Sequence, residues 1–247
     1  MKTKKIVSAG PLVLEAVYPR GAANDAPPIR AGKRKLSTEA QQRMNAKYSY
    51  RKLELMLAAN FLPGDLIVTL TYDNDHAPKS RQEAVARLKK FRAQLTKARK
   101  ARGCSLVMIW ATENVFDQGR WHHHAVINAS GADFEEIRRC WPYGSNVEIE
   151  KLKIDKTHSY EGIARYMCKE ARERPGLRSW SYTRNCRHPE VETFPVPDDT
   201  PLQAPKGATI YEEATERNDY GSFRFVKYLA PNWRRAKRPK TARRRRR

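Results

Sequence analysis

The stretch that decides the fold is Gly119-Arg120-Trp121-His122-His123-His124-Ala125-Val126-Ile127-Asn128, which holds three of the six histidines of the chain. The apolar run after the histidines predicts a turn that leads into a β-strand. Alternate side chains of a strand share a face, so His122 and His124 point one way and His123 points the other way. Two imidazoles about 7 Å apart on one face can reach a single metal ion, although two surface histidines beside an ordinary strand give the same pattern.

Apolar periodicity predicts the elements around this strand. The expected helices cover residues 37–60, 81–101, 134–140 and 160–172, and the expected strands cover 66–72, 105–113, 146–153, 179–183 and 223–229. Four prolines in residues 195–207 predict a loop there. This order predicts an α+β fold with a central, largely antiparallel sheet. We expect helices on one face of the sheet and the site of His122 and His124 on the other.

The chain divides into three parts by composition. Residues 1–35 are basic and irregular, and we expect a flexible arm with at most a short strand at 12–17. Residues 36–230 are expected to form one domain with a leading helix. Residues 231–247 form a tail rich in arginine and lysine, which we expect to be disordered.

The charge of the chain predicts an anionic polymer as partner, most simply a nucleic acid. The formal net charge is +22, and it remains +12 without the ten basic residues of 234–247. Trp121, Trp180 and Tyr182 could stack on bases, whereas Trp110 is expected in the core. The sequence shows no signal peptide or membrane span, and its four cysteines form no C-x-x-C pair. These features predict a cytoplasmic protein with no membrane partner.

Glu113 ends the strand that precedes the histidine loop. If the two strands form a hairpin, Glu113 lies across from residues 121 and 122, within about 4.5–5.5 Å between Cβ atoms. A carboxylate and two imidazoles on one face would form a site for Mg²⁺, Mn²⁺ or Zn²⁺. The structural alternative is a carboxylate that pairs with Arg120.

Tyr166 and Lys169 lie three residues apart in the predicted helix 160–172, so they share a helical face. An ammonium group near a phenol favours the phenolate, which is a nucleophile for phosphoryl transfer. The pair alone is a weak signal, because a core tyrosine beside a surface lysine is far commoner. Tyr160 lies about 240° away around the helix, and we expect it to be a packing or DNA-contact residue.

Three motifs occur in a fixed order: Val68-Thr69-Leu70-Thr71-Tyr72, then Glu113 with Gly119–His124, then Tyr166-Met167-Cys168-Lys169. This set resembles the HUH endonucleases, specifically the rolling-circle replication initiators of plasmid and filamentous-phage type. Their motifs are a Thr-Leu-Thr strand, a His-hydrophobe-His strand and a Tyr-x-x-Lys helix. The resemblance covers roughly residues 35–230 and implies an RRM-like, ferredoxin-like domain.

The resemblance also implies roles for individual residues. Glu113, His122 and His124 would hold a divalent metal, Mg²⁺ or Mn²⁺. Tyr166 would attack a phosphate of single-stranded origin DNA, which would leave a 5′-phosphotyrosine and a 3′-OH for a polymerase. Lys169 would steady the phosphate or the phenolate. Candidate DNA-binding residues are Thr69, Thr71, Arg120, Arg165 and Arg184, and candidate protein partners are a host helicase and polymerase.

The chain departs from the family pattern at His123, which stands where a large hydrophobe is usual. If His123 faces the core, it must be neutral and hydrogen-bonded. Three other readings remain open at this stage: a relaxase or single-strand transposase with the same chemistry, a non-catalytic basic nucleic-acid-binding protein, and a metal hydrolase that uses water.

Overall fold

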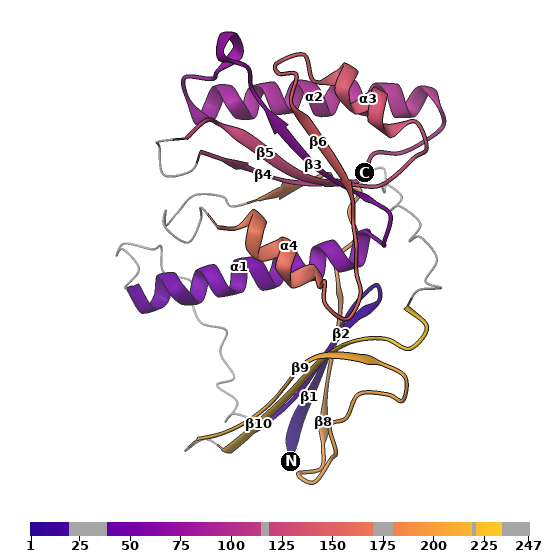
Figure 1. Cartoon of the computed structure of the whole chain (residues 1–247). Coiled ribbons are helices and arrows are strands. Elements are labelled where there is room, and N and C mark those ends of the chain that lie inside the picture. The colour runs from indigo at the N-terminus through magenta and orange to yellow at the C-terminus, as the bar shows by residue number, and fades with distance from the viewer. Residues whose placement is uncertain (20–38, 115–118, 170–179, 219–220, 234–247) are drawn as a thin grey trace, which may run out of the picture.

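The computed structural model describes residues 1–19, 39–114, 119–169, 180–218 and 221–233. Two antiparallel five-stranded sheets lie at opposite ends of this part of the chain, with two helices between them and two above the first sheet (Figure 1). The expected α+β class with an antiparallel sheet is therefore confirmed. The second sheet was not expected.

The first sheet has the strand order β6-β3-β5-β4-β7. Its strands are β3 (Leu66–Thr71), β4 (Met108–Glu113), β5 (His122–Ile127), β6 (Val147–Lys151) and β7 (Ser181–Tyr182). Each of these strands matches a predicted one, and β7 is the shortest. All the pairings are antiparallel, so β4 and β5 form the expected hairpin.

Helices α2 (Arg81–Ala101) and α3 (Asp133–Cys140) cover one face of this sheet. The helix α2 begins at Ser80, whose hydroxyl accepts a hydrogen bond of 3.2 Å from the backbone N–H of Glu83. Its apolar stripe, formed by Leu88, Phe91 and Leu95, packs against alternate residues of β3. The predicted helix 81–101 and its core stripe are therefore confirmed.

Helices α1 (Glu39–Asn60) and α4 (Tyr160–Met167) lie on the opposite face, between the two sheets (Figure 1). Leu53 and Leu57 of α1 and Met167 of α4 share a core with Ile109 and Val126 of the sheet. The face that carries His122 and His124 is thus partly covered by helices, whereas we expected it to be open. The apolar sides of α1 and α4 need a partner, and the site face provides it.

The second sheet has the order β8-β1-β2-β10-β9. Its strands are β1 (Lys2–Ala9), β2 (Leu12–Pro19), β8 (Glu190–Val196), β9 (Thr209–Asn218) and β10 (Gly221–Leu229). The expected flexible arm is wrong for residues 2–19, because β1 and β2 form a hairpin through Gly10, with β2 also bonded to β10. The rest of the arm, 20–38, and the tail from 234 lie outside the described residues.

Ion pairs and apolar contacts join the second sheet to the helices. The ammonium of Lys227 on β10 lies 3.2 Å from Glu54 of α1 and also pairs with Glu161 of α4. Lys227 is 3% exposed and Glu54 is 2% exposed. Because both charges are buried, each depends on the other for compensation, and the cluster holds α1, α4 and the second sheet together.

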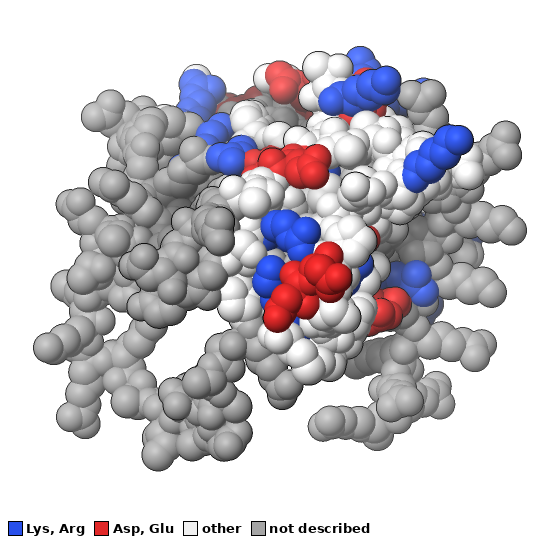
Figure 2. Space-filling model, turned by 90° about the horizontal axis from the view of Figure 1, so that it is seen from below, with Lys and Arg blue, Asp and Glu red and all other residues white. Residues whose placement is uncertain are grey.

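The end of the molecule formed by the second sheet shows acidic and basic side chains side by side rather than one basic face (Figure 2). The excess positive charge of the described chain therefore does not mark that end as a uniform anion-binding surface. Among the described residues, no helix combines the length and the apolar character needed to cross a membrane.

Candidate active site

The candidate site lies on the β4–β5 hairpin, on the side of the first sheet opposite α2. Glu113 pairs directly with His122, and Ala111 pairs with His124, so the carboxylate and the two imidazoles share one face. On the other side of β5, Thr69 pairs with His124. The expected cross-strand position of Glu113 is confirmed, and it depends only on the register of this hairpin.

The three side chains converge on one point. Glu113 Oε2 lies 3.4 Å from His122 Nε2 and 3.5 Å from His124 Nε2. The candidate ligand atoms of all three residues lie within 4.8 Å of one another. Ligand atoms about 2.1 Å from one ion lie about 3.0–3.4 Å apart in octahedral or tetrahedral geometry. The observed spacing is therefore close to what a bound cation requires.

Unsatisfied polar atoms support the same conclusion. Both carboxylate oxygens of Glu113 and Nε2 of His124 are buried and have no hydrogen-bond partner. Buried polar atoms normally have partners, so a group of three such atoms around one point needs an explanation. A divalent cation satisfies all three, and mixed imidazole and carboxylate donors suit Mn²⁺ and Zn²⁺ well and permit Mg²⁺.

The remaining ring nitrogens orient the two imidazoles. His122 Nδ1 lies 3.0 Å from the carbonyl oxygen of Arg120. A carbonyl can only accept, so this nitrogen carries the proton and Nε2 keeps its lone pair for a ligand. His124 Nδ1 lies 3.2 Å from the hydroxyl of Thr69, which fixes that ring in the same way. Thr69 thus positions a candidate ligand.

The electrostatics of the site favour an ionised carboxylate. Burial favours the neutral form of Glu113, but the adjoining imidazoles of His122 and His124 and the ammonium of Lys169 outweigh burial and lower the pKa of Glu113 to about 2. Burial alone would lower the pKa of His122, but its contacts with Glu113 and the Arg120 carbonyl raise it. This arrangement of charges can be neutralised by a divalent cation.

Tyr166 and Lys169 reach the same point from α4 and the residues after it. The ring of Tyr166 lies 4.6 Å from the ring of His124, centroid to centroid, and its side chain remains half exposed, at 49%. The ammonium of Lys169 lies 4.2 Å from the Tyr166 ring and 3.2 Å from Glu113 Oε2. An accessible phenol, an ammonium and the carboxylate therefore meet at one place.

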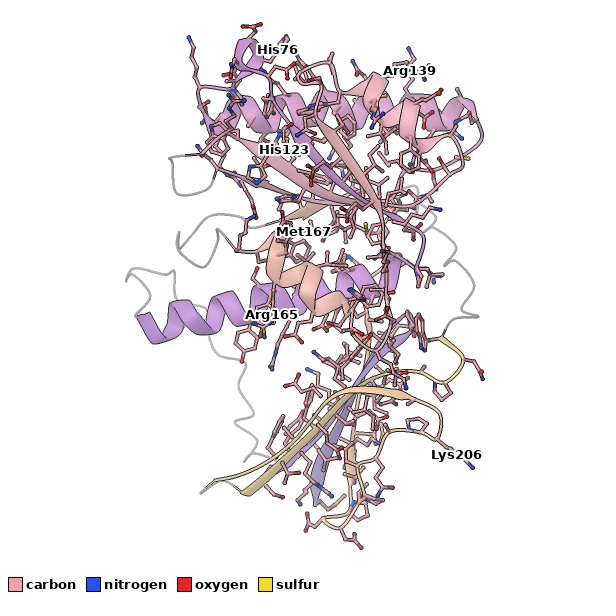
Figure 3. The ribbon with its side chains drawn as sticks, viewed as in Figure 1. His76, His123, Arg139, Arg165, Met167 and Lys206 are labelled. Atoms are coloured by element: carbon pink, nitrogen blue, oxygen red, sulfur yellow. The ribbon has the colours of Figure 1, made fainter. Side chains whose placement is uncertain are left out.

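His123 faces the core on the α2 side, as its position in the strand predicts (Figure 3). Its Nε2 lies 2.7 Å from the hydroxyl of Tyr72, and its Nδ1 lies 3.0 Å from the hydroxyl of Thr112. Complete burial lowers the pKa of His123 to about 3, so the ring is neutral. The sequence predicted the need for partners but did not identify them. Thr112 could have been found from its position opposite His123 in the hairpin.

Several other candidate residues lie apart from the site. Arg165 is on the side of α4 away from the first sheet, where it pairs with Glu161 at 2.6 Å and stacks on Tyr50 (Figure 3). Arg120 bonds to Asn74, and Arg184 is exposed in the turn after β7.

The other two candidates form hydrogen bonds to backbone carbonyls. The Thr71 hydroxyl donates to the carbonyl of Asn146 at 2.6 Å, and Thr71 pairs with His122 across the strands. Tyr160 is fully buried, and its hydroxyl donates to the Phe61 carbonyl at 2.7 Å, so it is a packing residue.

Comparison with known proteins gives one informative match. Residues 65–171 match the family model for the replication-associated protein ORF2, and this segment includes β3, the β4–β5 hairpin and α4. The match supports a role as a replication initiator and therefore an interaction with DNA. No curated protein matches the chain. Among solved structures, the hypothetical protein ORF119 from Sulfolobus islandicus rod-shaped virus 1 is 15% identical, over 48% of this chain and 90% of that chain, with a TM-score of 0.33.

Proposed function

We propose that the protein is a metal-dependent endonuclease that nicks and rejoins single-stranded DNA at a specific origin sequence and so initiates rolling-circle replication. The observation that carries the proposal is the convergence of Glu113, His122 and His124 with the ring of Tyr166 and the ammonium of Lys169. The replication-associated family match over the same segment supports the choice of DNA as substrate.

Each side chain has a chemical part in this proposal. Glu113, His122 and His124 hold Mg²⁺ or Mn²⁺, which when bound polarises the phosphate under attack and stabilises the charge that develops there. Lys169 places a positive charge beside both the phenol ring and the carboxylate. A cation at that position stabilises the phenolate of Tyr166 or the phosphate, whichever carries the charge.

The reaction is a transfer of one phosphodiester. Tyr166 gives up its phenol proton, and its oxygen forms a bond to phosphorus. The bond from phosphorus to the 3′ oxygen breaks, and that oxygen takes up a proton to become a free 3′-OH. The products are a 5′-phosphotyrosine and a primer end for a polymerase, and the reverse reaction rejoins a strand. The half-exposed position of Tyr166 leaves room for a polymeric substrate.

The test is covalent capture. The wild-type chain is incubated with Mn²⁺ and a pool of single-stranded oligonucleotides with a randomised centre, and the denatured protein is searched for a tryptic peptide that carries a nucleotide. We expect the adduct on Tyr166 and its loss in Tyr166→Phe. The matched control is Tyr48→Phe, which removes the hydroxyl of an exposed tyrosine on α1.

Each other outcome identifies a different protein. Cleavage without an adduct that continues in Tyr166→Phe indicates a hydrolase that uses water. Binding without any cleavage indicates a non-catalytic DNA-binding protein. An adduct on a tyrosine other than Tyr166 overturns the assignment of the nucleophile. A relaxase or single-strand transposase would give the same adduct and would differ in the DNA sequence that it selects.

A further inference from the structure

A second pocket lies on the other face of the first sheet, where α2 passes the edge formed by β4 and β7. Its volume is about 320 Å³, within the range of small-ligand sites. Six of the residues that line it are basic or aromatic: Arg81, Lys89, Arg92, Trp110, Trp180 and Tyr182. The lining residues that the structure describes include no carboxylate. The pocket is therefore suited to a ligand with a flat ring and negative charge.

The basic side chains reach this pocket by helical spacing. Arg81, Lys89 and Arg92 lie on the side of α2 next to its buried stripe, so they face the sheet edge rather than open solvent. The guanidinium of Arg92 lies 5.2 Å from the centre of the Trp110 ring. This cation–π pair holds an aromatic surface in place before any ligand arrives.

The aromatic side chains come from two neighbouring strands. Trp110 is partly buried on β4, and Tyr182 is partly buried on β7, where its ring lies 5.7 Å from that of Trp180. We expected Trp110 in the core, and it does pack against the core on the α2 side, but one part of it lines the pocket. Aromatic rings beside cations are the usual surface for stacking the bases of single-stranded DNA.

The pocket is connected to the candidate active site through β4. Thr112 lines the pocket, and the next residue, Glu113, points to the opposite face as a candidate metal ligand. In the described part of the chain, β7 pairs with β4 only at Ile109 and Trp110, so no strand is paired with β4 on that side at residues 111–113. A DNA strand that leaves Tyr166 can pass around this edge to the pocket.

We propose that this pocket binds one unpaired nucleobase of the same DNA strand that Tyr166 cleaves, and so contributes to the choice of origin sequence. The base stacks on the aromatic rings, and its neighbouring phosphates contact Arg81 and Lys89. This inference rests on the proposed function for its substrate. It adds a second point of recognition on the face of the sheet opposite the cleavage site.

The test measures binding in the absence of cleavage. All proteins carry Tyr166→Phe and are kept in EDTA, so the readout does not depend on the metal or on the covalent step. A single-stranded oligonucleotide is selected from a randomised pool by this protein, and its affinity is measured by fluorescence anisotropy. The variant is Lys89→Ala with Arg92→Ala, and the matched control is Lys90→Ala with Lys97→Ala, two exposed positions of α2 that do not line the pocket.

We expect the pocket variant to lose about tenfold or more in affinity, because stacking and cation contacts are both weakened. The control removes the same charge and should lose much less. An oligonucleotide series with one abasic position at a time should show one position whose base matters to the parent protein. At that position the pocket variant should show no further loss, as expected when base and pocket act together.

A third variant, Tyr182→Ala, guards against a trivial loss of folding in the double variant. It should show the same loss at the same abasic position. Equal losses in the pocket and control variants would mean that only general charge is involved and would overturn the proposal. An abasic series with the same profile in both proteins, or no binding of single-stranded DNA at all, would also overturn it. The proposed nicking activity fails separately, by the absence of a Tyr166 adduct.

Discussion

Replacing His123 with leucine tests the assignment of the middle histidine of β5 to the core. The imidazole is completely buried, and both of its nitrogens are bonded to hydroxyls, those of Tyr72 and Thr112. Burial lowers the pKa of His123 from 6.5 to about 3. Between these two pH values the unfolded chain binds a proton on this residue and the folded chain does not, so acid favours unfolding.

The size of the effect follows from these two values. The stability that His123 leaves intact above pH 6.5 is lost as the pH falls towards 3, at about 1.4 kcal/mol per pH unit for one proton. Between pH 7.5 and pH 5 the free energy of unfolding should therefore fall by about 2 kcal/mol because of this residue. His123→Leu removes that slope. At pH 7.5 the variant should be about 1–2 kcal/mol less stable than the wild type, because the Thr112 hydroxyl loses its partner.

The assay is urea denaturation at several pH values from 7.5 to 5, in EDTA. The difference between wild type and His123→Leu should shrink steadily and nearly vanish close to pH 5. His76→Leu, which removes an exposed imidazole that is hydrated in both states, is the matched control for the loss of one histidine. A constant difference across this pH range would refute the reasoning, because it would mean that His123 takes up a proton equally in the folded and unfolded chains.

Three further predictions concern the packing and the metal site. Lys227→Met should destabilise the chain by about 3–5 kcal/mol in chemical denaturation, because Glu54 is left buried without its cation, and adding Glu54→Leu should recover part of the loss. Gly10→Ala should lower the melting temperature more than Gly64→Ala: both glycines have positive φ, but a Cβ at Gly10 would lie 2.3 Å from a carbonyl oxygen of α1, whereas none lies near Gly64. Mn²⁺ should raise the melting temperature of the wild type but not of Glu113→Ala, and an equal rise in both would place the ion elsewhere.

Local patterns were sufficient for most of the first sheet. The alternation in His122–Ile127 and the helical spacing of Leu88, Phe91 and Leu95 are properties of short segments, so strand, helix and facing direction could be read before any contact was known. The cross-strand position of Glu113 followed because the two strands are consecutive and joined by a short loop. Tyr166 and Lys169 were paired correctly in sequence, since three residues of helix place them on one side.

The sequence by itself thus determined the α+β class, the order of the elements in the first sheet and which candidate ligands share a face, because these depend on periods of two and 3.6 residues within single segments. The second sheet was decided only in three dimensions. Strand β9 is highly charged and strand β8 is mostly exposed, so neither shows a clear apolar alternation, and each is a strand because a neighbour supplies its hydrogen bonds. The packing of α1 and α4 beside the site, and the meeting of Tyr166 with His124, also join residues distant in the chain, and no local pattern encodes such a contact.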